Sequence, residues 1–264
     1  SKLFRKNLFG ETHPYGKELE ELEVQDLTRI QLTGHRDEFM QDVVVFASGK
    51  LDDKVQQLLI DEFSSWKTRP VAPKGITAGD HKLFHEYTEK EGSVQSSVRI
   101  GKKSLQRTHA DYVEVLLLSH ILGGYFGSRL MKNIREEKGL TYGIHASIHA
   151  LQQDSYMLIG ADVNKENVTV TFDEVRKELK RLRTEKIADD ELEIARNHFI
   201  GSLQSELTTP FAHADKIRTI KLFGLPENYY QIMISKLDRT TSEDLIQIGE
   251  KHFHEESFSD AAVG

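Results

Sequence analysis

The 264-residue sequence contains no cysteine. This absence excludes disulfide bonds, cysteine-ligated zinc, iron–sulfur clusters and thiol nucleophiles. It leaves the compartment open, because cysteine-free chains occur in both the cytoplasm and the periplasm. The chain is nevertheless long enough to bury a hydrophobic core without covalent cross-links.

Long apolar runs are also missing. No segment approaches the roughly 20 apolar residues that a membrane-spanning helix needs. The longest candidate, residues 112–122, is interrupted by Glu114 and His120, so it predicts a helix in a protein core. Residues 1–6 are followed by no apolar segment, so no signal peptide is visible. We therefore expect a cytoplasmic protein, with the periplasm as the alternative, and no membrane partner.

Proline is scarce, and its distribution indicates a boundary. Of five prolines, Pro70 and Pro73 stand close together in a stretch that also holds Gly75 and Gly79 and shows no hydrophobic periodicity. Such composition is typical of a linker. We predict a linker at 69–80.

Known catalytic and metal-binding motifs are absent. Lys and Arg number 35 against 42 Asp and Glu, and the net charge of −7 argues against nucleic acid as the main partner. No Gly-x-Ser-x-Gly occurs, and none of the 12 histidines belongs to a His-Glu-x-x-His or His-x-x-Glu-His motif. His81 with His85 and His145 with His149 fall on predicted strands, where a spacing of four residues means about 13 Å. His252 and His254 offer only a weak surface site. We predict no metal ligand and no catalytic residue in this chain.

Hydrophobic patterning predicts an α+β fold. The continuous run Val43–Ala47 indicates a buried strand over 42–48, and alternation at 83–89 and 93–101 predicts a hairpin. Further strands are expected at 141–150, 154–162 and 257–263. Helices are expected at 51–66, 109–122, 128–137, 164–184 and 189–208, with three more between residues 210 and 253 and partly helical structure at 20–39. The order predicts a two-layer antiparallel sheet with helices packed on one face.

One segment carries a specific resemblance. Residues 124–143 read GYFGSRLMKNIREEKGLTYG, in which a glycine-rich turn leads to Ser-Arg-Leu, Ile-Arg, Gly-Leu and a tyrosine. This pattern resembles the C-terminal domain of the pitrilysin/insulinase (M16-type) zinc peptidases, which include the mitochondrial processing peptidases. The likeness continues more loosely to the last helix. It implies the repeated domain of that family, here at residues 81–264 and preceded by a partial copy at residues 1–68.

The resemblance implies roles for Arg135 and Tyr142. In the family, an arginine and a tyrosine seven residues apart reach the active site from this domain and hold the substrate backbone. A guanidinium and a phenol can both donate hydrogen bonds to a peptide carbonyl or a developing oxyanion. The alternative is structural: Arg135 would pair with Glu136 or Glu137, and Tyr142 would pack on the sheet.

The family's zinc motif has no counterpart here. Residues 9–16, with His13-Pro14, resemble the loop that follows the zinc ligands, so the two histidines and glutamate of that motif have no matching positions. The resemblance implies a fragment of a zinc metallo-endopeptidase, inactive alone, that binds peptide and leaves zinc to the parent enzyme or a partner. The alternative is a naturally non-catalytic, peptide-binding subunit paired with a zinc-bearing partner. The apolar strand at 42–48 needs a neighbour, so we expect a homo- or hetero-oligomer, such as a dimer.

Overall fold

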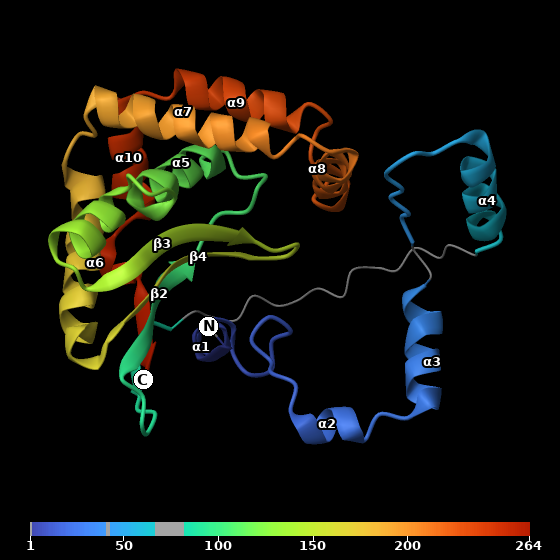
Figure 1. The fold of residues 1–264 in the computed structure, drawn as a ribbon, viewed down its shortest axis with the longest axis horizontal. Coiled ribbons are helices and arrows are strands. Elements are labelled where there is room, and N and C mark those ends of the chain that lie inside the picture. The colour runs from blue at the N-terminus through green and yellow to red at the C-terminus, as the bar shows by residue number, and fades with distance from the viewer. Residues whose placement is uncertain (1, 41–42, 67–81) are drawn as a thin grey trace.

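The computed structural model describes residues 2–40, 43–66 and 82–264 (Figure 1). Its centre is a sheet of five strands in the order β1-β5-β2-β4-β3. The strands are β1 (His85–Thr88), β2 (Gln95–Lys103), β3 (Thr141–Ala150), β4 (Ser155–Asn164) and β5 (Ser259–Val263). All neighbours are antiparallel except β1 and β5. The predicted α+β class is confirmed.

The predicted hairpin is wrong, although both of its strands exist. β5 lies between β1 and β2, parallel to the former and antiparallel to the latter. The turn between β1 and β2 is bound to the residue that follows β5, since Lys90 N–H donates to the Gly264 carbonyl at 2.7 Å. Alternation of apolar residues identifies a strand but not its neighbour, and here the neighbour lies some 170 residues away in sequence.

One face of the sheet, the inner face, carries the large hydrophobic core. α5 (Tyr112–Gly123) and α6 (Val168–Thr184) contact this face. α7 (Asp189–Ser205), α9 (Tyr229–Arg239) and α10 (Ser242–His252) pack on these two helices, as Figure 1 shows. In α5, Leu117, Leu118 and Ile121 are fully buried, so the prediction of a core helix is confirmed. No helix in the described ranges combines the length and apolar character of a membrane span.

The opposite face, here called the outer face, is partly covered by α1 (Lys2–Phe9). Phe4, Leu8 and Phe9 of this helix are buried in a small cluster with Tyr156 and Ala261 of the sheet. In Figure 1, α1 lies across the sheet from the inner-face helices. The predicted layer of helices on one face thus gains a short helix on the other.

The segment after the first turns is poorly packed. α2 (Glu21–Gln25), α3 (Arg29–Phe39) and α4 (Asp53–Ser64) contain no buried residue, and Figure 1 shows α3 and α4 apart from the sheet. α4 confirms the helix predicted at 51–66. The strand predicted at 42–48 is wrong: residues 43–48 have no regular structure. A strand requires hydrogen bonds to a neighbouring strand, and none in the described part of the chain lies beside them. The predicted linker at 69–80 falls outside the described residues.

Candidate functional site

The structure brings Arg135 and Tyr142 together. Arg135 belongs to η1 (Met131–Glu137), a helix with wide π-type turns, and Gly139, with φ +64°, redirects the chain into β3. Arg135 Nε donates to the Tyr142 carbonyl oxygen at 2.9 Å, and its guanidinium lies 4.5 Å from the centre of the Phe126 ring. Widened turns of this kind are frequent at functional sites.

Tyr142 owes its orientation to a bulge at the start of β3. Thr141 pairs with Val163 and Ile144 with Ala161, so β3 carries one extra residue between these pairs. The Thr141 hydroxyl donates to the Asp162 carbonyl at 2.7 Å and fixes the bulge against β4. A bulge redirects side chains, and here Tyr142 is 96% exposed. The structural alternative for Tyr142, packing on the sheet, is therefore wrong.

The structural alternative for Arg135, an ion pair with Glu136 or Glu137, finds only weak support. Arg135 Nη1 lies 4.0 Å from the Glu136 carboxylate, at the limit of an ion pair, and the Arg135 side chain is 32% exposed. Both candidate residues line an open depression of about 590 Å³, together with residues from β2 and β4 such as Gln95 and Asp162. The site thus presents one cation and one phenol at the end of a sheet.

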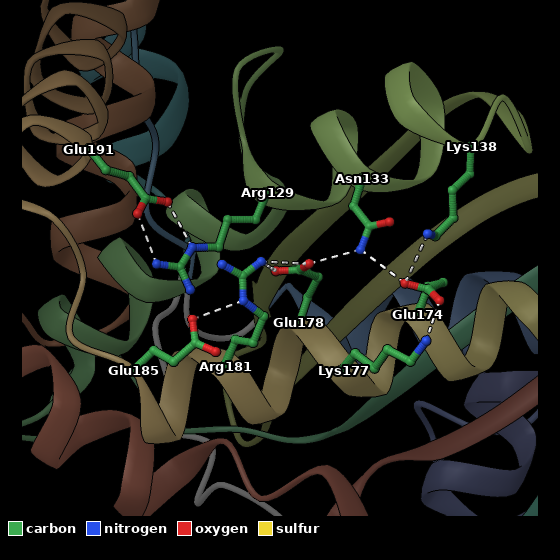
Figure 2. Close-up of polar contacts among 9 residues, drawn as sticks. All are labelled: Arg129, Asn133, Lys138, Glu174, Lys177, Glu178, Arg181, Glu185 and Glu191. Carbon is green, nitrogen blue, oxygen red and sulfur yellow. Dashed lines mark hydrogen bonds and ion pairs between the residues drawn. The ribbon is translucent and has the colours of Figure 1, made fainter.

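A polar network anchors the helix that carries Arg135 (Figure 2). The Asn133 amide donates to Glu174 at 3.1 Å and to Glu178 at 2.8 Å, which ties η1 to α6. One turn earlier, Arg129 forms two hydrogen bonds with Glu191, at 2.7 and 2.8 Å, which tie the same segment to α7. The segment that leads to Arg135 is therefore anchored to two helices, α6 and α7.

The two carboxylates of this network are buried but surrounded by cations. The side chains of Glu174 and Glu178 are 8% and 3% exposed. Lys177 hydrogen-bonds Glu174 and lowers the pKa of its carboxyl, with smaller contributions from Asn133 and Lys138 that together outweigh burial. Arg181 binds Glu178 at 3.1 Å. Lys177 and Arg181 of α6 thus neutralise the two carboxylates that bind Asn133.

No zinc site fits the residues that the structure describes. Within them, no group of three or more histidine and acidic side chains lies close enough to hold a metal ion. His252 Nε2 is instead 2.7 Å from Asp111, and this contact, together with Lys251, lowers the pKa of Asp111 to about 2. His120 and His198 hydrogen-bond each other at 3.1 Å. His81 lies outside the described residues.

His120 predicts a dependence of stability on pH. It is 9% exposed on α5 and stacks on Tyr125 at 5.0 Å. Burial, and to a lesser extent His198, lowers its pKa from 6.5 to about 4. The unfolded chain binds a proton below pH 6.5 that the folded chain accepts only below about pH 4. Stability is therefore lost as the pH falls through this window, by about 2 kcal/mol between pH 7 and pH 5.

Urea denaturation at pH 7 and pH 5 measures this loss. We expect His120→Phe, which keeps the aromatic contact, to reduce the difference, while His254→Phe at the protein surface leaves it unchanged. An equal difference in wild type and His120→Phe would show that other groups cause the pH dependence.

Sequence reasoning missed two parts of the site. Phe126, which supports the guanidinium, is 61% exposed, and an aromatic residue between the glycines of the turn was the available signal. The Asn133 contacts to α6 span 41 and 45 residues in sequence and had no local signal.

The chain matches the family model described as the "Peptidase M16 inactive domain" over residues 40–199. It is 28% identical over 168 residues to the "Uncharacterized zinc protease YmxG" of Bacillus subtilis, covering 62% of this chain and 40% of that protein. It is 20% identical over 248 residues to the "Probable inactive metalloprotease YmfF" of the same organism, covering 87% of this chain and 54% of the relative. The chain thus spans about half the length of these curated relatives.

Solved structures agree on the fold. A crystal structure of a peptidase M16 inactive domain from Pseudomonas fluorescens superposes with a TM-score of 0.84 at 22% identity, covering all of this chain and 64% of that one. At this identity the likeness shows a shared fold, with the same arrangement of sheet and helices.

Proposed function

The chain belongs to the peptidase M16 family, and from that premise we propose that it holds the peptide substrate of a zinc metallo-endopeptidase. The two side chains that hold it are Arg135 and Tyr142. The observation that carries this proposal is that Arg135 and Tyr142 line the same depression and that Tyr142 is 96% exposed. Family relatives are named zinc proteases, and the residues described here do not fit zinc. We propose that zinc belongs to another domain or subunit and that this chain alone is inactive.

The chemistry of the two groups suits a peptide backbone. A guanidinium has five N–H donors and a phenol has one, and both can donate to a carbonyl oxygen. The Nε–H of Arg135 donates to the Tyr142 carbonyl, which leaves the Nη groups for a ligand. Stacking on Phe126 and the bond to the Tyr142 carbonyl hold the guanidinium in one orientation, so less conformational entropy is lost when a peptide binds.

A second candidate is a non-catalytic, peptide-binding subunit that pairs with a zinc-bearing partner. It is favoured by the match to a domain described as inactive and by a relative named as an inactive metalloprotease. Both candidates require a covering partner or domain. Leu22, Ile30 and Phe39 of α2 and α3 are 70%, 83% and 69% exposed, and apolar surface of this extent marks an interaction site. We propose that it is covered in a homo- or hetero-oligomer or by the rest of the parent chain.

Fluorescence polarisation with an unstructured, labelled peptide tests the proposal. We expect the chain to bind the peptide, and Tyr142→Phe to weaken binding about 5-fold, the effect of one lost hydrogen bond. Glu137→Gln, at an exposed position of η1, the helix that carries Arg135, should leave binding unchanged. If the purified chain with added zinc cleaved the peptide and a chelator stopped the cleavage, the proposed inactivity would be wrong.

A further inference from the structure

Part of the outer face of the sheet stays open beside α1. It forms a depression of about 890 Å³ whose walls come from α1, β2, β4 and β5. Gln95 and Asp162 line both this depression and the one that holds Arg135 and Tyr142. The two depressions therefore adjoin at these residues, and a peptide held at Tyr142 that passes them would lie over the open sheet.

Arg99 lies on this open face. It stands on β2 opposite Gly160 of β4. A Cβ at Gly160 would come within 3.4 Å of Arg99 Cδ and Nη1, so glycine leaves room for the arginine to lie across β4. Arg99 Nη1 donates to the carbonyl of Val98 at 2.7 Å and to that of Ala161 at 3.2 Å. These bonds hold the guanidinium in place through one nitrogen.

The charge of Arg99 is only weakly compensated. Its ion-pair partner is Asp162, 3.9 Å from Nη1, with a side chain that is itself 65% exposed. Among the residues that the structure describes, Nε and Nη2 of Arg99 have no hydrogen-bond partner, and the side chain is 22% exposed. Three lysines also line this depression, and the charged lining residues are Lys2, Lys6, Lys90, Arg99, Glu18 and Asp162. Lys6 is paired with Glu11 at 2.7 Å, which leaves three cations against two carboxylates.

We propose that Arg99 binds a carboxylate of the peptide substrate, from an acidic side chain or from the C-terminus. A guanidinium with a free N–H edge suits a carboxylate, which it can bind through two parallel hydrogen bonds. The inference rests on the proposed function, because it concerns the same peptide. It adds a specificity: the preferred peptide is acidic at a defined distance from the segment held by Arg135 and Tyr142.

The sheet register sets that distance. Arg99 lies opposite Gly160, whereas Thr141, next to Tyr142, lies opposite Val163. The two anchors are thus offset by about three residues, or about 10 Å, along the strands and by two strand spacings, about 10 Å, across β4, which places them roughly 14 Å apart. An extended peptide covers this distance with four or five residues.

Polarisation with a set of labelled peptides of equal length tests the inference. The first type is a series in which a single glutamate is moved along a neutral, amidated peptide. The second type is the same peptide without glutamate, neutral and amidated. The third type is neutral with a free C-terminus. We expect an acidic peptide of the first or third type to bind about 10-fold more tightly than the neutral amidated one, and the series to show one preferred position. Arg99→Gln should abolish this preference, and Arg99→Glu should transfer it to peptides with lysine at that position.

Two controls separate this inference from the proposed function. Arg135→Ala should weaken the binding of all peptides equally and keep the preference for the acidic peptide. Lys132→Gln, which removes an exposed charge of η1, should change neither the affinity nor the preference. Thermal melting confirms that each variant is folded. If Arg99→Gln does not fold, Arg99→Lys replaces it: lysine keeps the charge but lacks the planar N–H edge, so it should reduce the preference for the acidic peptide without abolishing it. Equal binding of acidic and neutral peptides, or a preference that survives Arg99→Gln, would overturn the inference and leave the proposed function intact. Failure of every peptide to bind would overturn both.

Discussion

Replacing Arg135 with alanine is expected to lower kcat/KM of the zinc-bearing, assembled peptidase for a peptide by about 100- to 1,000-fold, the usual effect of removing a preorganised donor at a reacting carbonyl. The guanidinium is aimed by its Nε bond to the Tyr142 carbonyl and by the Phe126 ring. If the contact forms mainly in the transition state, kcat falls as much as kcat/KM; if it forms equally in the bound substrate, only KM rises.

The conservative variant separates charge from geometry. Arg135→Lys keeps the positive charge but loses the planar arrangement of donors, so it should recover only part of the activity. Arg135→Ala also removes a bond to the start of β3, and Tyr142→Phe isolates the contribution of the phenol. Since Tyr142 is 96% exposed, its replacement should not change the melting temperature.

Steady-state kinetics on a fluorogenic peptide measure these effects, and Lys132→Ala on the same helix serves as the control. Activity of Arg135→Ala within twofold of wild type would refute the substrate-holding role, and the arginine would then be a structural residue.

The parts of the fold predicted correctly are those with local signals. β3 begins at Thr141 and ends at Ala150 as predicted, because a left-handed glycine and a polar turn delimit it. Strand neighbours were not predictable in this way. β5 separates β1 from β2 because the N–H groups of Asp260 and Gly264 donate to the carbonyls of Phe84 and Thr88, which are more than 170 residues earlier in the sequence. The run at 43–48 shows that an apolar pattern alone does not make a strand when the described chain supplies no partner.

The candidate site was predictable to the same degree. The family resemblance indicated Arg135 and Tyr142 as a pair, but their geometry depends on a bulge defined by Val163 and Ala161 of another strand. The domain division at residues 68 and 81 stays a prediction.

The largest effect on stability is expected from Asn133→Leu, which should lower the free energy of unfolding by about 3 kcal/mol. The Asn133 amide is the group that donates to both Glu174 and Glu178 (Figure 2). Leucine is similar in size but offers no donor, so two buried carboxylates one helical turn apart would each lose a hydrogen bond. Glu174 keeps Lys177 and Glu178 keeps Arg181, so the cost is that of two lost hydrogen bonds to charged groups, each about 1.5–3 kcal/mol.

The hydrogen bond from Asn133 gives this variant a distinctive pH dependence. Asn133 contributes to lowering the pKa of the Glu174 carboxyl, so without the amide that pKa should rise and the folded variant should take up a proton more readily than wild type. A carboxyl whose folded pKa is raised stabilises the protein at low pH and loses that contribution as the pH rises. The deficit of Asn133→Leu relative to wild type should therefore be smaller at pH 5 than at pH 8.

Urea denaturation of single and double variants tests this account. Glu174→Gln in the Asn133→Leu background removes one of the two charges and supplies a donor, so it should restore about 1 kcal/mol or more, the size of one hydrogen bond. Glu185→Gln, at the exposed partner of Arg181, is the matched control and should cost less than about 0.5 kcal/mol. A deficit that is equal at both pH values and unaffected by Glu174→Gln would mean that Asn133 acts through packing alone. If instead the network sets the orientation of η1, Asn133→Leu should also weaken peptide binding through Arg135, whereas Glu185→Gln should not.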